Sequence, residues 1–424
     1  MIKDIFVKQF NHFVNRRGFD NNDEPLDTIL TVIKDDQWRH VRNYITPTFS
    51  GKKLRQMTSL INGAADRLIK NLKPKVDNNG DIEIKDTCGG YTMDVISCTA
   101  FGMQVDSQKN PNDPFVVHAK QIFEPNSFAM KYAMFVIFFA PFMMPILKFL
   151  RLPRGFPKSL TTFFQKVVDE ALVERRKEKD DPNKTMDFLQ LMVQAEEEAA
   201  LSDLDKTENP TKRRGLTQSE IMSQAFLFFL AGYETTSSTL SFTMYMLSVN
   251  PECLEKAIQE VDEVLGDEIP TYDTAKKLHY IQMCIDESLR IYSIAPRVDR
   301  VANDDVVLGG IHIPKDMVVA IPISAIHMDP KYWDEPEKFD PERFTPEAKA
   351  KRDPYVYMPF GHGPRNCIGM RLALLESKIA IARILQNFSL TKSPKTKEPV
   401  KPNKLGQLRV EGGLWVKMTP RNKE

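Results

Sequence analysis

The 424-residue sequence has few cysteines and no excess of charge of either sign. Its five cysteines are an odd set without a Cys-x-x-Cys pair, which argues against a disulfide framework and favours reduced thiols. Its 58 lysines and arginines nearly balance 57 acidic residues, for a formal net charge of +1. Such a balance does not suggest nucleic acid or any strongly charged partner.

Linkers and internal repeats are also lacking. Without a Gly/Ser-rich or Pro-rich linker, the chain is predicted to form one domain over residues 1–424, with ample core to bury a cofactor. The N-terminus opens with Lys3 and Asp4 and has no small-residue cleavage site, so it does not have the pattern of a signal peptide.

The most apolar run, residues 134–147, is interrupted by Pro141 and Pro145 and is too short to cross a bilayer. Two interpretations remain open. The run is either a core segment, which its periodicity slightly favours, or a patch that dips into a membrane surface.

The pattern of apolar residues predicts a mainly helical α+β fold with a small sheet component. Thr217 and Glu220 form a capping box before a helix over residues 218–249, which is apolar around most of its circumference and therefore buried. A second helix is predicted over residues 275–292, and another begins just after Cys367.

Strand signals follow the second helix. Val306–Leu308 and Ile311–Ile313 flank the dipeptide Gly309-Gly310 and predict a β-hairpin. Residues 317–321 predict a further strand.

The strongest chemical signal is the glycine-punctuated loop around Cys367, FGHGPRNCIG at residues 360–369. A thiolate that ligates a haem iron needs a rigid loop whose backbone approaches closely, and Gly361, Gly363 and Gly369 are expected to allow positive φ there. The positive end of the following helix favours thiolate over thiol.

Arg365 in the same loop is placed to pair with a haem propionate, because a guanidinium fork matches a carboxylate. The alternative is an incidental cysteine in a turn before a helix. From this composition, the pattern F-x-x-G-x-R-x-C-x-G is expected by chance in roughly 3 of 100,000 such chains. The pattern therefore strongly favours a haem-thiolate site.

This loop resembles the haem-binding signature of the cytochrome P450 superfamily. Residues 229–242 (FLAGYETTSSTLSF) and 329–344 (DPKYWDEPEKFDPERF) are similar to segments of its microsomal family-3 branch, which oxidises drugs and steroids. The resemblance implies the cytochrome P450 fold with a long central helix. It also implies haem b (iron protoporphyrin IX) as cofactor, Cys367 as metal ligand, and cofactor contacts from Phe360, Gly361, Arg365 and Gly369.

The segment Ala231–Thr236 lies in the middle of the long predicted helix. Gly232 costs about 1 kcal/mol in a helix interior, so a local distortion that leaves space beside the backbone is expected. Hydroxyls bonded back to carbonyls are an equally good explanation of the segment alone. The resemblance implies that Thr235 stabilises a reduced oxygen intermediate and that Glu234 delivers protons.

Glu287 and Arg290 are three residues apart, so that both charges lie on one helical face. This pattern alone has little specificity. The resemblance implies that Arg343 completes a buried Glu-Arg-Arg network with a structural role.

Trp38 and Arg42 lie four residues apart on one predicted helical face, and the resemblance assigns both to a haem propionate. Arg16 and Arg300 match further propionate-binding positions. Each arginine taken alone is more often a solvated surface charge.

A predicted substrate pocket follows from the same resemblance, lined by Leu227, Leu230, Ala231, Ile294 and Ala295. An apolar pocket favours lipophilic substrates bound with loose orientation. The resemblance also favours the membrane-facing interpretation of the Phe/Met-rich segment 123–149, which would cover the pocket.

The resemblance implies a monooxygenase that inserts one atom of O2 into lipophilic small molecules, such as steroids, lipids or xenobiotics. Electrons would come from an NADPH-dependent cytochrome reductase, with cytochrome b5 as a further candidate, at the cytoplasmic face of the endoplasmic reticulum membrane. Arg371 and Lys378 are either reductase contacts or ordinary surface charges. The transmembrane helix, hinge, first helix and two strands of microsomal members are lacking, so an N-terminally truncated chain is expected.

Two other functions remain open. A haem-thiolate isomerase or synthase needs no external electrons, and the Glu234–Thr235 pair argues against it. A catalytically silent haem-binding protein is the second alternative, and a reduced-CO difference spectrum tests whether a thiolate-ligated haem is present.

Overall fold

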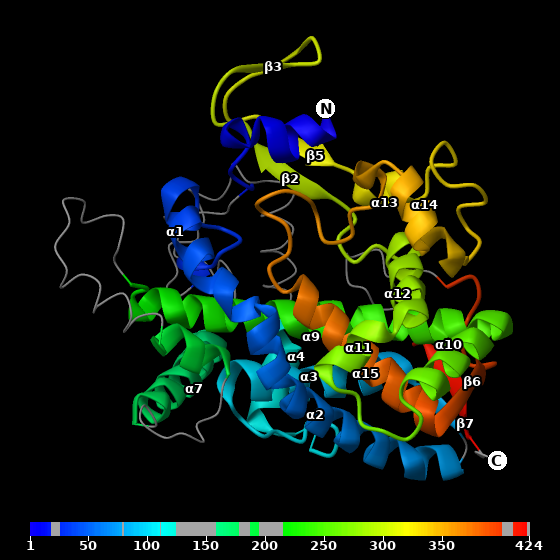
Figure 1. Ribbon diagram of the computed structural model, residues 1–424. Helices are drawn as coiled ribbons and strands as arrows, with labels where there is room; N and C mark the ends of the chain where they lie inside the picture. Colours follow the sequence, from blue (N-terminus) through cyan, green and yellow to red (C-terminus); the bar gives the residue numbers. More distant parts are fainter. Residues whose placement is uncertain are drawn as a thin grey trace. The chain divides into compact units, whose positions relative to one another are not determined.

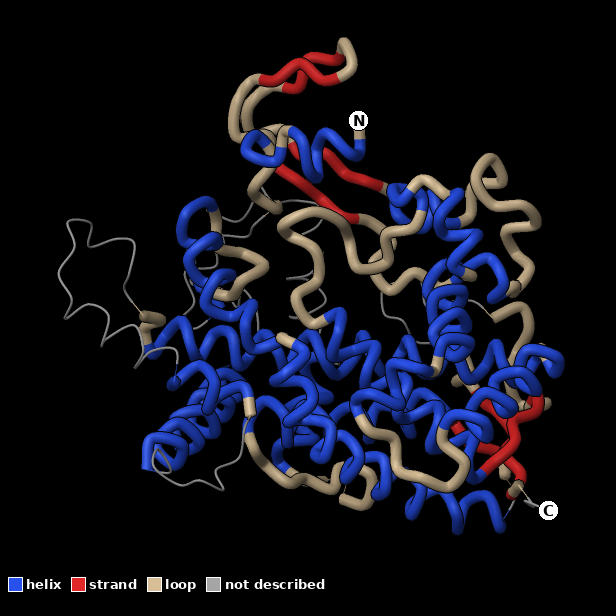
Figure 2. The backbone as a smooth tube through the Cα atoms, in the orientation of Figure 1, coloured by secondary structure: helices blue, strands red, loops and turns tan. Residues whose placement is uncertain are grey.

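The computed structural model describes residues 1–17, 26–78, 80–110, 112–123, 158–177, 187–194, 215–400 and 410–421. These residues are mainly helical, with small antiparallel sheets (Figure 2), as the α+β prediction required. The apolar run at 134–147 and nearly all of segment 123–149 lie outside the described residues. Within the described part, none of the helices combines the length and apolarity needed to span a membrane.

The chain groups into two compact units. Unit 1 comprises residues 1–15, 49–95 and 232–424, and unit 2 comprises residues 16–48 and 96–231. Two helices, α3 (Ile84–Phe101) and α9 (Gln218–Val249), continue from one unit into the other. The single domain over residues 1–424 stays a prediction.

Unit 1 is organised around α15 (Met370–Asn387), whose residues 379–382 are completely buried. This helix packs against α2 (Gly51–Asn78) and three further helices because its apolar residues cover most of its circumference. The other helices of unit 1 are α10 (Pro251–Val264), α11 (Tyr272–Lys277), α12 (His279–Ile291), α13 (Ile323–His327) and α14 (Pro346–Lys351), with short turns η1 (Asp4–Lys8), η2 (Phe10–His12), η7 (Pro341–Phe344) and η8 (Pro354–Val356).

The sheets described in unit 1 are all antiparallel. The strand order in one is β1 (Asp81–Glu83), β7 (Trp415–Pro420) and β6 (Phe388–Lys392), and a second pairs β2 (Val298–Val301) with β5 (Val318–Ile321). The predicted hairpin is confirmed as β3 (Val306–Leu308) and β4 (Ile311–Ile313), which projects beyond β2 and β5 (Figure 1). Gly309 and Gly310 both have positive φ, which a tight two-residue turn requires.

Unit 2 contains α1 (Asp35–Ile45), α4 (Pro114–Phe123), α7 (Lys158–Lys177) and the turn η3 (Leu26–Thr28); η4 (Thr46–Phe49) joins it to unit 1. Its core is aromatic. Phe115 lies edge-on to Phe101 and to Phe164, with ring centroids 5.8 and 5.6 Å apart, and Phe229 of α9 packs 4.7 Å from Phe164. Such contacts bury large apolar areas.

The helix α9 has the predicted bounds and is continuous in Figure 1. Its capping box is present: Thr217 N donates to Glu220 Oε2 at 2.9 Å, and Glu220 N donates to Thr217 Oγ1 at 3.2 Å. Helical structure continues through Gly232. The local distortion expected at this glycine therefore does not break α9.

The helix predicted over residues 275–292 is wrong in its extent, because two helices meet at Leu278. The carboxylate of Glu260 on α10 accepts hydrogen bonds from the backbone N–H groups of Tyr280 (2.6 Å) and Ile281 (2.9 Å). It thus caps the N-terminus of α12, which therefore starts separately from α11.

Candidate functional site

The loop before α15 presents the thiol of Cys367, which is exposed. Cys367 N donates to Phe360 O at 2.8 Å, which closes the loop on itself. Gly361 and Gly363 have φ of 71° and 75°, as expected. A Cβ on Gly363 would overlap the backbone oxygen of Phe6, so the N-terminal segment packs directly against this loop.

The expectation of positive φ at Gly369 is wrong, because its φ is −84°. Gly369 is the N-cap of α15, a position whose backbone any L-residue adopts, and a Cβ there would meet only the ring of Phe49 at 3.9 Å. The helix begins at Met370, three residues after Cys367. The loop therefore leads directly into a helix N-terminus, an end whose partial positive charge favours nearby anions.

The other cysteines differ from Cys367 in burial. Cys88, Cys98 and Cys284 are buried, and Cys253 is half-buried. Burial raises the pKa of the Cys88 thiol to about 12 and also raises the pKa of Cys253 and Cys284. These three thiols are therefore neutral.

Besides Arg290, two further arginines of unit 1 are almost completely buried: Arg300 on β2 is 1% exposed and Arg365 is 2% exposed. The Arg300 guanidinium lies 4.8 Å from the ring centroid of Phe6 and donates to Asp299 O at 3.0 Å. A buried guanidinium is a geometric and electrostatic match for a carboxylate. The two propionates of a haem are such carboxylates.

The other predicted propionate residues lie in unit 2. Trp38 and Arg42 are on α1, where their spacing puts them on one face, and Trp38 is 4% exposed. Arg16 is half-buried and precedes α1. Their roles stay predictions.

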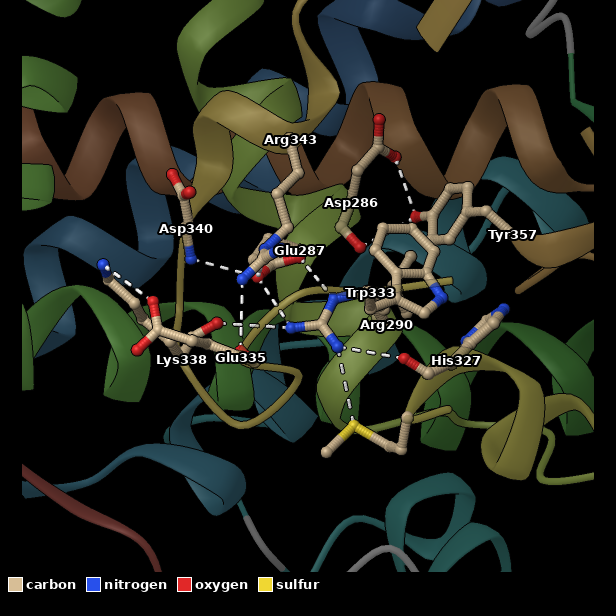
Figure 3. Close-up of polar contacts among 12 residues, drawn as sticks. Asp286, Glu287, Arg290, His327, Trp333, Glu335, Lys338, Asp340, Arg343 and Tyr357 are labelled. Atoms are coloured by element: carbon tan, nitrogen blue, oxygen red, sulfur yellow. Dashed lines mark hydrogen bonds and ion pairs between the residues drawn. The ribbon is translucent and has the colours of Figure 1, made fainter. Parts of the chain in front are cut away.

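The structure brings Glu287, Arg290 and Arg343 together (Figure 3). Arg290 holds Glu287 with two hydrogen bonds of 2.7 and 2.8 Å, and Arg343 Nε lies 3.4 Å from Glu287 Oε1. Arg290 also donates to the backbone oxygens of His327 (2.9 Å) and Lys338 (3.3 Å). Since Glu287 and Arg290 are fully buried, this group fixes the chain from α12 to η7.

The middle of α9 differs from the rest of the helix in exposure. Ala231 and Thr235 are exposed and Glu234 is half-buried, whereas all residues from 221 to 229 and from 236 to 248 are buried. Ala231 and Thr235 are one turn apart and so share a face. This short strip of the helix faces open space, as a position beside a bound cofactor requires.

The hydroxyls that follow this strip bond back to helix carbonyls, as the alternative explanation proposed. Ser238 Oγ donates to Glu234 O at 2.8 Å, and Thr239 Oγ1 donates to Thr235 O at 3.0 Å. These bonds coexist with the exposed strip at Ala231 and Thr235. The two explanations of this segment are therefore compatible.

No motif in the sequence indicated the partner of Glu234. Lys85 Nζ on α3 lies 3.0 Å from Glu234 Oε1, and the two side chains are 8% and 13% exposed. The residues are 149 positions apart, so no local pattern could have paired them. A second missed group is Glu376 on α15, whose pKa is raised to about 8 by complete burial, against a hydrogen bond from Thr236 that lowers it.

The predicted pocket residues fall in both units. Leu227, Leu230 and Ala231 lie on α9 in unit 2, and Ile294 and Ala295 lie between α12 and β2 in unit 1.

Lys378 is 9% exposed and burial lowers its pKa, so its interpretation as a surface charge is wrong; Arg371 is exposed.

An exposed cysteine thiol in a loop before a helix, together with buried arginines, is what a protein that holds a haem through a thiolate requires. The model of the cytochrome P450 family matches residues 1–418. The chain is 41% identical over 423 residues to cytochrome P450 3A11 of Mus musculus, and 39% identical over 430 residues to cytochrome P450 3A7 of Homo sapiens. These alignments cover 99% and 100% of this chain and 81% of each relative.

The chain therefore belongs to the cytochrome P450 family, within the branch of the 3A proteins. It is a haem-thiolate monooxygenase that acts with a substrate, dioxygen and a reductase. The exposed thiol, the buried arginines and the exposed strip of α9 fit this cofactor.

Proposed function

We propose that Cys367 is the iron ligand, that Arg300 and Arg365 neutralise the propionates, and that Thr235 and Glu234 are the catalytic pair. The single observation that carries the catalytic assignment is the exposure of Thr235 between two buried stretches of α9, directly beside a half-buried carboxylate. Helix packing requires neither an exposed hydroxyl nor a half-buried carboxylate at these two positions.

When bound, the haem supplies dioxygen activation and C–H hydroxylation, with the thiolate donating electron density to it. The loop hydrogen bond from Cys367 N to Phe360 O holds the sulfur in one position. The hydroxyl of Thr235 holds a proton at the exposed strip, and Glu234 replaces that proton from the solvent side.

The proposed substrates are lipophilic small molecules that resemble steroids, lipids or xenobiotics. Leu227, Leu230 and Ala231 on α9, with Ile294 and Ala295, are the residues proposed to contact them. This proposal is supported by the apolar character of all five side chains, which favours contact area over directional hydrogen bonds.

We further propose that the electron donors are an NADPH-dependent cytochrome reductase and cytochrome b5, at the endoplasmic reticulum membrane. Segment 123–149 is the proposed membrane contact. The similarity to the 3A proteins supports both assignments.

The decisive experiment is a reduced-CO difference spectrum of the purified chain. A thiolate-ligated haem absorbs near 450 nm, and Cys367→Ser should abolish that band while leaving the fold intact by circular dichroism. An unchanged band in Cys367→Ser would refute the assignment. Product formation from steroids and lipophilic xenobiotics should then require NADPH and reductase, whereas an isomerase would turn over without them.

A further inference from the structure

The ammonium of Lys85 is enclosed by groups of α9. Nζ donates to Ser238 Oγ at 2.6 Å, to Ser237 Oγ at 2.7 Å and to the backbone oxygen of Glu234 at 3.2 Å. It also lies 3.0 Å from Glu234 Oε1. Lys85 is the second residue of α3, immediately after β1, so a short strand anchors its backbone.

The two serines connect the ammonium to the helix backbone. Ser237 Oγ and Ser238 Oγ donate to Glu234 O at 3.1 and 2.8 Å while each accepts from Lys85. Every N–H of the ammonium therefore has an acceptor on one turn of α9. A buried lysine held so completely has a fixed position.

The carboxylate of Glu234 is held on one side only. Oε1 contacts Lys85, whereas Oε2 is buried and makes no hydrogen bond within the part of the chain that the structure describes. Buried carboxylate oxygens are nearly always satisfied. Because Oε2 is not engaged in such a hydrogen bond, it is suited to exchange a proton with a transient partner such as a water molecule.

We propose that Lys85 is a positioning residue of the proton path: it holds the Glu234 carboxylate in place through Oε1, so that Oε2 accepts a proton from solvent and passes it toward Thr235. This inference rests on the proposed catalytic role of Glu234. One proton enters and one leaves, and no electron moves. After each proton transfer, Glu234 is again an ionised carboxylate paired with the Lys85 ammonium.

None of the other titratable groups described here near this pair supplies a positive charge to balance the Glu234 carboxylate. Cys88 on α3 has a pKa raised to about 12 by burial, so its thiol is neutral. Glu376 faces α9 from α15 and is kept mostly protonated at neutral pH by a pKa of about 8. Glu83 on β1 accepts backbone hydrogen bonds from Asp86 (2.6 Å) and Leu414 (3.0 Å). The cation that balances Glu234 is therefore Lys85.

The test compares Lys85→Gln with Lys85→Arg, which keeps the charge. The matched control is Lys349→Gln, which breaks another lysine–carboxylate pair of unit 1, 2.9 Å from Asp286. Lys85→Gln removes the cation that lies 3.0 Å from Glu234 Oε1, and the loss of an adjacent cation favours the protonated form of a carboxyl. Infrared difference spectra of Lys85→Gln should then show a new protonated-carboxyl band that is absent from wild type, from both other variants and from the double variant Lys85→Gln/Glu234→Gln.

The second readout is the NADPH consumed per product formed. Lys85→Gln should change this ratio about tenfold and alter its pH profile, whereas Lys85→Arg should restore it. In a Glu234→Gln background, the Lys85→Gln change should have no further effect. If Lys85→Gln does not fold, Ser237→Ala/Ser238→Ala removes two ammonium contacts and is measured in the same way.

A variant that loses thermal stability but shows neither the new band nor a changed ratio would overturn the inference, since Lys85 would then be purely structural. Loss of the 450 nm band already in the wild-type chain would instead count against the proposed function. The infrared measurement needs no haem and separates these two failures.

Discussion

The backbone N–H of Met358 donates a hydrogen bond of 2.9 Å to Nε2 of His327. The other ring nitrogen, Nδ1, lies 3.0 Å from Ser293 Oγ, so the ring is assigned as the neutral Nδ1–H tautomer. His327 is fully buried at the end of α13, and Met358 lies two residues before the cysteine loop begins. A neutral imidazole therefore ties the approach to the cysteine loop to the Glu287–Arg290 network, because Arg290 donates to His327 O.

This imidazole should make folding stability depend on pH. Burial, with a smaller effect of Arg290, lowers the pKa of His327 to about 4. In the unfolded chain the imidazole takes up its proton near pH 6.5. The unfolded state therefore binds more protons between these values, and stability contributed by the neutral ring is complete above pH 6.5 and is lost as the pH falls toward 4.

Urea unfolding of wild type and His327→Gln at pH 7, 5.5 and 4.5 measures this contribution. The difference between the two proteins should shrink by up to about 3 kcal/mol from pH 7 to 4.5. Taking the difference cancels the titration of other groups. A constant difference across this range would show that the ring titrates normally in the folded state.

The sequence correctly predicted the elements whose ends are set by their own capping or turn residues. The capping box of Thr217 and Glu220 and the Gly309-Gly310 turn are complete within a few residues, and both elements have the expected bounds. The break at Leu278 was not predictable in this way, because Glu260 on another helix caps α12.

In the candidate site, too, the sequence predicted contiguous motifs but not contacts between residues far apart in the chain. The loop around Cys367 is a contiguous pattern, so its residues were named from the sequence. Lys85 was not, since its contact with Glu234 exists only after α3 and α9 pack. The prediction for Gly369 was wrong because a glycine in such a loop is typical of a turn with positive φ. In the structure, Gly369 is instead the N-cap of α15, with φ of −84°.

Removing the charge of Glu287 should destabilise the fold. Glu287→Gln would leave the fully buried Arg290 without its anion, even though the shape of the side chain is kept. The expected cost is about 3–5 kcal/mol in the free energy of unfolding. The matched control is Asp273→Asn, which breaks the exposed pair with Arg55 and should change the free energy of unfolding far less, because solvent screens that pair. Equal costs for the two variants, by urea unfolding, would show that the buried network is not a stabilising element.

Two glycines of the cysteine loop should respond differently to a methyl group. Gly363→Ala forces an L-residue to φ of 75° and places its Cβ against Phe6 O, so it should cost about 2 kcal/mol or more and reduce haem loading. Gly369→Ala meets only an ordinary contact at a normal φ and should stay within about 1 kcal/mol of wild type. Absorbance of bound haem per protein and urea unfolding measure both effects, and a larger loss in Gly369→Ala would contradict this account of the loop.

The buried carboxyl of Glu376 should reverse the usual pH dependence of an acid. Burial raises its pKa to about 8, against a hydrogen bond from Thr236 that lowers it. Because the folded state holds a proton that the unfolded chain releases near pH 4.5, this group's contribution to stability is greatest below pH 4.5 and is lost as the pH rises toward 8. Glu376→Gln replaces the protonated acid with a neutral isostere, so the variant should match wild type at pH 5 and exceed it by a few kcal/mol at pH 9. Urea unfolding at the two pH values measures the difference. A variant that is equally destabilised at both would show that Glu376 is ionised in the folded state and is held by contacts other than the one with Thr236.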